Sequence, residues 1–402
     1  MSNLPAPSPH DVVILGGART PLGKLMGDLA SQDVVALGAH AIKHAVARSG
    51  IEPSDVQRVI MGQVILAGAG QNPARQAAIK AGLPWSTTAE LINKVCLSGL
   101  DAIIHASRML RLGEAEVIVA GGQESMTNAP HVARGVRQGK GYGGLKLEDS
   151  LERDGLVDSF DAVSMGTLTD GPLVRMKISR EEQDEVAARS HQLAAKAQAE
   201  GIFAEEIVPM EIPQRKGDPK IVSEDQGIRP DTTVESLAKL RPAFLKENGT
   251  ITAGNASQLT DGACAVVLTT RGWAEERGLE YLAVVGKAGL TAGPDNSLHA
   301  QPSDSLQEAL RLAQWDAQEL DFIEINEAFG AVVVKSLREL DYPLERCNIH
   351  GGAISLGHPV GCSGARLAYT AAMELKRRGS GRAGVALCGG GGQGDALLLY
   401  RD

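Results

Sequence analysis

The second half of this 402-residue chain repeats the pattern of its first half. Residues 51–60 align without gaps with residues 315–324, and each segment holds a turn, an acidic residue and then an apolar pair that enters a predicted strand. Residues 96–99 correspond to 361–364 in the same way, and an alanine-rich helix is expected after both. Internal repetition predicts two matching α/β halves related by pseudo-two-fold symmetry. The ends of equivalent strands should then converge near one central cleft.

Apolar strands alternate with helices along the first half. We predict strands at 12–15, 59–61 and 116–120, and an amphipathic helix at 33–49. This alternation is typical of a parallel sheet with helices on both faces. The expected fold class is therefore α/β, built from two repeated halves.

A polar segment between residues 125 and 249 interrupts the alternation. It is broken by Gly and Pro, except for one helix predicted by the capping box at 179–182. We interpret the segment as an insertion carried by the sheet domain. The predicted domains are an N-terminal half at 1–125 completed by 250–274, the insertion at 126–249, and a C-terminal half at 275–402.

Charge, cysteine count and hydropathy narrow the function classes. The net charge of −9 argues against a general nucleic-acid binder, although a local basic patch could still hold an anionic ligand. Five cysteines without CxxC spacing predict neither a disulfide framework nor a zinc site. The chain has no secretory pattern at its start and no apolar run of membrane-spanning length. We therefore expect a cytoplasmic protein with no membrane partner.

Cys96 lies directly before an apolar helix that is predicted to end at Gly113. The free N–H groups and the positive dipole at a helix N-terminus stabilise a thiolate, which makes Cys96 a candidate nucleophile. A lone cysteine at such a position is more often part of the core. The catalytic interpretation therefore needs partners elsewhere in the chain.

The second half supplies such partners at the equivalent strand ends and helix starts. Asn326 follows a predicted strand, His358 precedes the repeated helix, and Cys388 follows the last core strand. Each also has a simpler interpretation: Asn326 as the cap of a helix beginning at Glu327, His358 as an exposed loop residue, and Cys388 as a small core residue. Their joint occurrence with the repeat favours one common site.

The glycine run at 389–392 does not fit a nucleotide-binding motif. No Lys-Ser/Thr pair follows it, which excludes a P-loop. Residues 396–400 read as a strand rather than as the helix that a dinucleotide fingerprint requires.

Together these residues suit carbon–carbon bond chemistry on a thioester. The Cys96 thiolate could accept an acyl group while His358 takes the thiol proton. A second, neutral thiol at Cys388 could move a proton at the carbon α to a carbonyl. Backbone N–H groups at Cys96 and in the glycine run, with the amide of Asn326, could stabilise oxyanions.

The chain resembles the thiolase family, which comprises acetyl-CoA acetyltransferases and 3-ketoacyl-CoA thiolases. The motifs that carry the resemblance span essentially the whole chain, at 93–99, 121–126, 253–257, 326–329, 351–361 and 388–394. The resemblance implies a five-layered αβαβα fold in which residues 126–249 form a loop domain for coenzyme A binding and oligomer contacts. It implies coenzyme A thioesters as substrates and no metal or redox cofactor. It also implies a homotetramer, or else a homodimer.

The resemblance further implies individual residue roles. Cys96 is the acyl-accepting nucleophile, Cys388 the acid/base, and His358 the activating base and an oxyanion donor. Asn326 holds a water in the first oxyanion hole, and the N–H groups of Cys96 and Gly390 form the second. The implied substrate-binding and coenzyme A-binding residues are Leu156, Met165, Ala253, Ser257 and Phe329, with Arg229 and Ser236 at the nucleotide end.

The implied reaction is the reversible condensation of two acetyl-CoA to acetoacetyl-CoA and CoA, by a ping-pong mechanism through acyl-Cys96. Lys-Val-Cys-Leu-Ser-Gly at 94–99 and the long insertion look more like the biosynthetic branch. Ser164 stands where that branch has His, which puts the short-chain preference in doubt. His350 replaces a common Asn, and we expect it to be structural. The alternatives are a degradative thiolase of broader or longer chain length, a ketoacyl-synthase type of condensing enzyme, and a non-catalytic acyl-CoA-binding scaffold.

Overall fold

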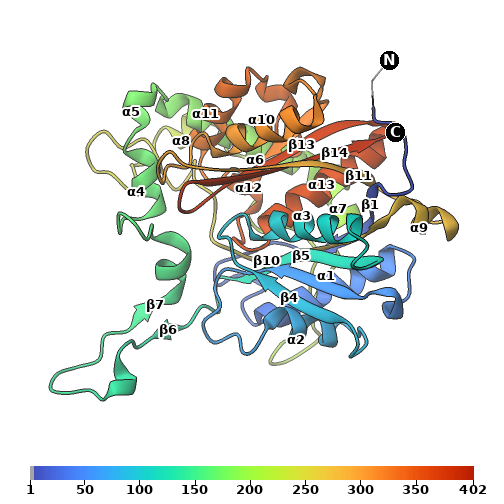
Figure 1. The fold of residues 1–402 in the computed structure, drawn as a ribbon. Helices are drawn as coiled ribbons and strands as arrows, with labels where there is room; N and C mark the ends of the chain where they lie inside the picture. Colours follow the sequence, from blue (N-terminus) through green and yellow to red (C-terminus); the bar gives the residue numbers. More distant parts are fainter. Residues whose placement is uncertain (1–3) are drawn as a thin grey trace.

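The computed structural model describes residues 4–402, which form five layers of helix and sheet (Figure 1). Two halves of one continuous sheet lie on either side of a central pair of helices, and further helices cover both outer faces. The αβαβα arrangement expected from the resemblance is therefore confirmed.

The N-terminal half of the sheet has the strand order β1-β10-β5-β3-β4. Helix α1 on its outer face begins as predicted, because the side chain of Asp33 accepts a hydrogen bond from the backbone N–H of Ala36 at 2.6 Å. The elements of this half are β1 (Val12–Arg19), β2 (Gly23–Lys24), β3 (Arg58–Gly62), β4 (Thr88–Ile92), β5 (Val117–Ser125), β10 (Thr260–Thr270), α1 (Val34–Arg48) and α2 (Pro73–Lys80).

The C-terminal half has the order β12-β13-β14-β11, and β11 pairs with β1 to join the two halves. Helices α10 and α11 cover its outer face. The elements are β11 (Ala283–Ala292), β12 (Phe322–Ile325), β13 (Gly381–Gly389), β14 (Gln393–Arg401), α10 (Gln301–Ala313) and α11 (Gly330–Leu340).

The central layer consists of α3 (Ser98–Arg111) and α13 (Ser363–Arg378). Both helices belong to one buried cluster with strands from the two halves of the sheet. Ile103 and Ile104 of α3 are 0% and 1% exposed, since a helix between two sheets has apolar neighbours on most sides. This placement explains why the sequence of α3 is apolar on most faces.

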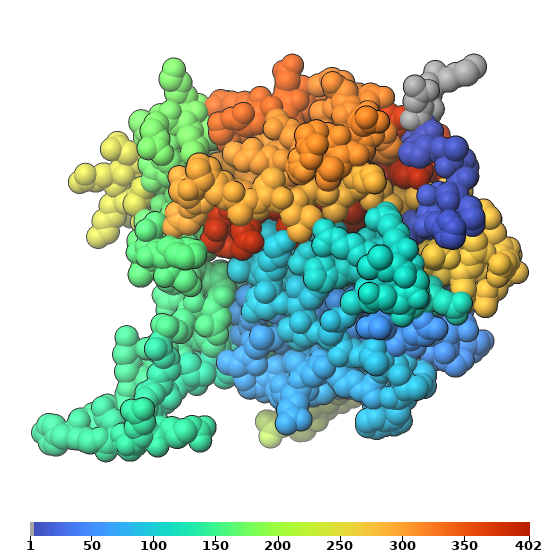
Figure 2. Space-filling model, in the orientation of Figure 1, coloured from blue at the N-terminus to red at the C-terminus, as the bar shows by residue number. Residues whose placement is uncertain are grey.

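An arm formed by the hairpin of β6 (His131–Val132) and β7 (Glu148–Asp149) extends away from the body of the molecule (Figures 1 and 2). The other elements of the inserted segment and the connections are η1 (Pro53–Asp55), η2 (Val136–Gln138), η3 (Glu152–Leu156), α4 (Met165–Asp170), α5 (Leu173–Met176), α6 (Arg180–Ala199), α7 (Ile202–Glu206), β8 (Met210–Ile212), β9 (Lys220–Val222), α8 (Val234–Leu237), α9 (Arg271–Glu276), η4 (Ala317–Glu319), η5 (Leu344–Arg346) and α12 (Ala353–Leu356). Within residues 4–402, no helix is long and apolar enough to cross a membrane.

The repeat inferred from the sequence is confirmed element by element. The short helix η1 precedes β3 just as η4 precedes β12, in the gapless alignment of 51–60 with 315–324. The two central helices also begin at matching serines, Ser98 and Ser363. The two halves are therefore copies of one α/β unit.

The prediction of a parallel sheet is wrong for the centre of the sheet. Only the pairs β3–β4, β3–β5 and β12–β13 are parallel. Strand β10, from beyond the insertion, lies antiparallel between β1 and β5, and the β13–β14 hairpin is antiparallel as well. The prediction that residues 250–274 complete this half placed β10 in it, but alternation along the first half could not reveal the direction of a strand that enters the sheet from more than 100 residues further along the chain.

Glycines let the two halves touch backbone to backbone at the centre of the molecule. A Cβ atom on Gly122 would lie 2.0 Å from the carbonyl oxygen of Gly361, and one on Gly364 would lie 2.4 Å from the backbone N of Leu100. Both contacts are with backbone, which cannot rotate away as a side chain could. The close approach of the two halves thus depends on the absence of side chains here.

Replacing Gly122 with alanine should lower the free energy of unfolding by about 1–3 kcal/mol, because the added methyl group overpacks the contact between the halves. Gly144→Ala is the matched control, since a Cβ there meets no atom within 4 Å. Chemical denaturation of both variants checks this. Equal stability of the two variants would contradict the packing argument.

Candidate active site

Four loops at the centre of the molecule bring the predicted catalytic residues together. Cys96 precedes α3, Asn326 follows β12, His358 lies between α12 and α13, and Cys388 is the penultimate residue of β13. The side-chain nitrogen Nδ2 of Asn326 is 3.4 Å from Nε2 of His358. The backbone N–H of Gly390 lies near enough to the Cys96 thiol to lower its pKa, and the Cys96 thiol lies close enough to the Cys388 thiol to affect its titration.

The segment before α3 holds Cys96 in a strained turn. Helix α3 begins at Ser98, so Cys96 precedes the first turn rather than lying in it. Val95 has φ = +53°, a left-handed conformation that β-branched residues rarely adopt. Such strain persists only where the surroundings enforce it, and it is concentrated at functional sites.

The N–H groups near Cys96 do not lower the pKa of its thiol below the ordinary value in the free protein. Burial raises the pKa of the Cys96 thiol to about 11, and this effect outweighs the hydrogen bonds from the backbone N–H groups of Gly390 and of Cys96 itself. The nearby Glu124 carboxyl raises the pKa slightly further. The thiol is therefore protonated at neutral pH and needs a base.

His358 is suited to be that base. It is buried, and burial lowers its pKa to about 4, so the ring is neutral at pH 7. Its Nδ1 atom lies 2.6 Å from the hydroxyl of Ser363, at the start of α13. Its other nitrogen, Nε2, faces Asn326 and the reaction centre. The exposed-loop interpretation of His358 is therefore wrong.

Asn326 does not cap a helix, because α11 begins at Gly330. Its side-chain oxygen Oδ1 is buried and has no protein hydrogen-bond partner. A buried orphaned oxygen of this kind indicates an ordered water or a ligand atom in the free site. The observation fits the water that the resemblance assigns to Asn326.

Cys388 is a buried thiol, and burial raises its pKa well above the usual range, with the neighbouring Cys96 adding to the effect. It therefore carries its proton at neutral pH. Because Cys388 is protonated and lies beside the Cys96 thiol, it can act as a proton donor at the site. A cysteine that only fills space in the core would not need a second thiol beside it.

A cavity of about 480 Å³ adjoins His358 and is lined mainly by apolar side chains. Five residues predicted to bind substrate line this cavity, namely Leu156, Met165, Ala253, Ser257 and Phe329. A second cavity of about 420 Å³ is lined by Arg229 and Ser236 and shares Ala253 with the first. The predicted binding residues therefore follow one path, from His358 to a basic side chain at the far end.

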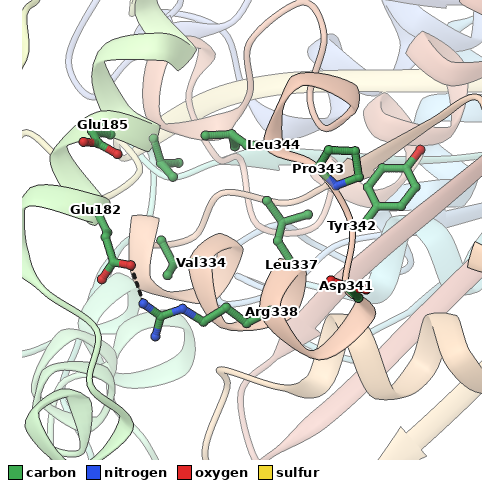
Figure 3. Close-up of a pocket in the computed structure, with 10 residues that line it drawn as sticks. Glu182, Glu185, Val334, Leu337, Arg338, Asp341, Tyr342, Pro343 and Leu344 are labelled. Atoms are coloured by element: carbon green, nitrogen blue, oxygen red, sulfur yellow. Dashed lines mark hydrogen bonds and ion pairs between the residues drawn. The ribbon is translucent and has the colours of Figure 1, made fainter. Parts of the chain in front are cut away.

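A further hollow of about 470 Å³ lies between α6 and α11 and contains none of the predicted site residues (Figure 3). Glu182 and Arg338 form an ion pair across it. Among residues 4–402 no group of three or more His, Cys, Asp or Glu side chains is arranged to hold a metal ion.

Sequence reasoning assigned no role to Glu124 or Phe244. Glu124 is buried and accepts hydrogen bonds from the backbone N–H groups of Val64 and Gly361, at 2.9 and 3.0 Å, so it ties the two halves together beside Cys96. The ring of Phe244 packs edge-on against Phe329 in the cavity wall, with 6.1 Å between centroids. A charged residue within an otherwise uncharged strand was the available signal for Glu124.

The two departures from the family pattern have different surroundings. His350 bonds to Glu374 at 3.0 Å, and Glu374 also pairs with two arginines of α13, which supports a structural role. Ser164 lines the cavity and caps α4, because its hydroxyl accepts a hydrogen bond from the backbone N–H of Thr167 at 3.1 Å.

A five-layered fold of two repeated halves, with two thiols, a histidine and an asparagine at its centre, defines the thiolase class of proteins. Family models described as "Thiolase, N-terminal domain" and "Thiolase, C-terminal domain" match residues 12–272 and 279–401. The chain belongs to the thiolase family.

Named relatives cover nearly the whole chain. A protein of Mycolicibacterium smegmatis named "Probable acetyl-CoA acetyltransferase" is 54% identical over 97% of this chain and 100% of its own length. The "Acetyl-CoA acetyltransferase" of Cupriavidus necator is 47% identical over 97% of this chain and 99% of its own. The crystal structure of the Bacillus anthracis acetyl-CoA acetyltransferase matches with a TM-score of 0.93 and 38% identity, and covers 97% of this chain and 98% of that one.

The rate of Cys96 alkylation by iodoacetamide should rise about tenfold per pH unit between pH 7 and pH 10, because only the thiolate reacts and its pKa is raised. Intact mass measured against a Cys96→Ser control isolates this thiol from the other four. A rate that is already constant at pH 7 would show that the resting enzyme holds a thiolate.

Proposed function

We propose that this chain is an acetyl-CoA acetyltransferase that catalyses the reversible condensation of two acetyl-CoA to acetoacetyl-CoA and CoA. The observation that carries the proposal is the meeting of two protonated thiols, Cys96 and Cys388, with His358, Asn326 and the Gly390 N–H, beside the cavity that His358 lines. One thiol is needed to hold the acyl group and the other to move the proton at carbon α.

In the direction of thiolysis, Nε2 of His358 takes the proton of Cys96, and the sulfur attacks the 3-keto carbon of acetoacetyl-CoA. The bond between carbons 2 and 3 then breaks, and its electron pair forms the enolate of acetyl-CoA. Cys388 protonates this enolate at carbon 2, and acetyl-CoA leaves. The protonated resting state of Cys388 is the state that this step requires.

The second half returns the protons. CoA gives its thiol proton to the Cys388 thiolate and attacks the acetyl group on Cys96. The released Cys96 thiolate recovers its proton from His358. Condensation is the reverse sequence. Donors fixed around the developing oxyanions, namely Asn326 through a water, His358, and the N–H groups of Cys96 and Gly390, contribute typically about 3 kcal/mol each.

Residues 126–249 are proposed as the loop domain that binds coenzyme A. Supporting this, the two adjoining cavities run from His358 to Arg229, whose guanidinium is half-buried and suits an anionic phosphate. Ser236, Ala253, Ser257, Leu156, Met165 and Phe329 are proposed to line the bound cofactor and acyl chain. No residue is proposed to bind a metal.

The arm is proposed to assemble the chain into a homotetramer, or a homodimer. Its apolar side chains Tyr142, Leu145 and Leu147 are exposed in the single chain, which favours an apolar partner surface. A cytoplasmic location is proposed, and the five free cysteines support a reducing compartment. A role in fatty acid β-oxidation is proposed only for the alternative in which the chain is a degradative thiolase of broader or longer chain length.

A thiolase of broader chain length is the second candidate, and Ser164 is the observation that favours it. Serine is smaller than histidine and leaves room in a cavity with a mainly apolar lining. A ketoacyl-synthase mechanism is disfavoured, because the second catalytic group here is a thiol in a glycine hairpin. A non-catalytic scaffold would have no need for this set of buried polar groups.

Replacing Cys96 with alanine should abolish thiolysis of acetoacetyl-CoA, followed by the loss of absorbance of its 3-keto thioester. Cys388→Ala should lower kcat by about 100-fold or more, since a positioned acid/base contributes 10²–10⁴-fold. Cys264→Ala is the control, because this buried β10 thiol is placed in the core cluster and not in the mechanism. Activity retained by Cys96→Ala would rule out the mechanism.

Thiolysis rates measured across 3-ketoacyl-CoA chain lengths decide between the two candidates. If Ser164 widens the acyl pocket, six- and eight-carbon substrates should react within about tenfold of the four-carbon substrate, and Ser164→His should remove that tolerance, since each methylene is worth about 1–3 kcal/mol of discrimination. A sharp four-carbon preference in the unmodified enzyme would instead show that the missing histidine matters little.

A further inference from the structure

One ion pair connects the two loops that carry the catalytic thiols. The ammonium Nζ of Lys94 lies 2.7 and 2.9 Å from the two carboxylate oxygens of Asp395. Lys94 is two residues before Cys96, in the strained segment that precedes α3. Asp395 lies on β14, opposite Leu387 and next to the Cys388–Gly394 pair of the β13–β14 hairpin. The contact therefore joins residues 301 positions apart in the chain.

Stability alone does not explain this pair. The Asp395 side chain is 0% exposed and that of Lys94 is 21% exposed, so both charges have lost much of their hydration. A buried ion pair is often no more stabilising than apolar residues of the same volume. Strand β14 is otherwise apolar around this position, with Ala396 and Leu397 following Asp395. The carboxylate of Asp395 is better explained by the position in which it holds Lys94 and the segment before α3.

The segment before α3 that Lys94 holds has a strained backbone, and it needs contacts that keep it in this conformation. Val95 has φ = +53°, and its backbone N–H is held by the Asn93 side chain at 3.2 Å. The Ser98 hydroxyl accepts from the N–H of Lys94 and donates to the carbonyl of Val95, at 2.8 and 2.6 Å. These contacts are all local to the segment. Within residues 4–402, the Lys94 side chain ties this turn to the opposite hairpin through a direct ion pair, in addition to the contact of Gly390 with the Cys96 thiol.

A second carboxylate biases where the ammonium group lies. Asp101 of α3 is 3.8 Å from Nζ of Lys94, and its Oδ1 atom has no hydrogen-bond partner. The ammonium group therefore lies closer to Asp395, which it contacts through both carboxylate oxygens, than to Asp101. Burial raises the pKa of Asp395 to about 6, so its carboxylate is charged at neutral pH.

We infer that the Lys94–Asp395 pair is a positioning device, which clamps the Cys96 segment to the Cys388 hairpin and sets the separation of the two thiols. The inference rests on the proposed function, in which both thiols act on one substrate. The two side chains are positioning residues, since their charged groups bind each other and take no part in the proposed reaction. They act through Cys96, Cys388 and the Gly390 N–H.

Steady-state thiolysis of acetoacetyl-CoA by Lys94→Met, Asp395→Asn and the double variant tests the clamp. Each single variant should lose about 100-fold in kcat, because a displacement of about 1 Å between reacting groups has that effect. KM should stay within about twofold of the unmodified value, since the cavities that bind substrate are untouched. The double variant should be no slower than the worse single variant, because the two residues act as one unit.

Asp402→Asn is the matched control. Asp402 forms a comparable two-oxygen pair with Arg271, at 3.0 and 3.2 Å, just beyond the end of β14 that lies opposite the Cys388–Gly394 end of the hairpin. Its loss should lower Tm while leaving kcat unchanged. Asp395→Glu keeps the charge and adds one methylene, so it provides a folded variant with a displaced clamp if the neutral variants do not fold; its kcat should fall as well.

Three results would overturn the inference: an unchanged kcat in the folded clamp variants, additive losses in the double variant, or a rise in KM instead of a fall in kcat. Failure of the proposed function looks different, because the unmodified protein would then show no thiolysis at all. In that event the alkylation rate of Cys96, compared between the unmodified protein and Asp395→Asn, tests the clamp, and equal rates reject it.

Discussion

The structure depends on the backbone contact between its two halves at the centre of the molecule. A Cβ atom on Gly62 would lie 2.7 Å from the carbonyl oxygen of Gly361, and one on Gly122 would lie 2.0 Å from it, both too close for a side chain. Side chains there would push the central helices apart, and with them the loops that carry Cys96 and His358. The site is thus assembled by residues that contribute no functional groups. Its precision comes from packing, which transmits small displacements instead of absorbing them.

Burial sets the chemistry of the assembled site. It raises the pKa of both thiols and lowers that of His358, so every member of the set is neutral at rest. A neutral site avoids the cost of holding unpaired charges away from water. Charge then develops only when a thioester carbonyl arrives to accept it, beside N–H donors that are already in place. The helix dipole that sequence reasoning relied upon is the weaker effect here.

Much of the fold and of the candidate site could be predicted from the sequence, because the internal repeat relates residues that are far apart in the chain. It gave the two halves, the central helices and the convergence of Cys96, Asn326, His358 and Cys388. The segment of β10 was assigned to the N-terminal half, but its antiparallel direction escaped prediction because strand pairing depends on partners distant in sequence. The raised pKa of Cys96 escaped prediction because desolvation depends on the complete fold. Lys94 and Asp395 carried no local signal that paired them across 301 residues.

The two halves have the same fold but contribute different side chains to the site. Glycines in one half, at positions where the other half has functional side chains, explain this difference. Asn326 projects its amide toward His358, whereas its equivalent in the first half is Gly62. A Cβ on Gly62 would lie 2.6 Å from the backbone N of Gly99, so no side chain fits there. In the alignment of 96–99 with 361–364, the equivalent of Cys96 is Gly361, and the adjacent Cys362 is fully buried in the central cluster. A symmetric site would need room for two sets of side chains around one centre. Reducing one set to glycine gives the other set that room.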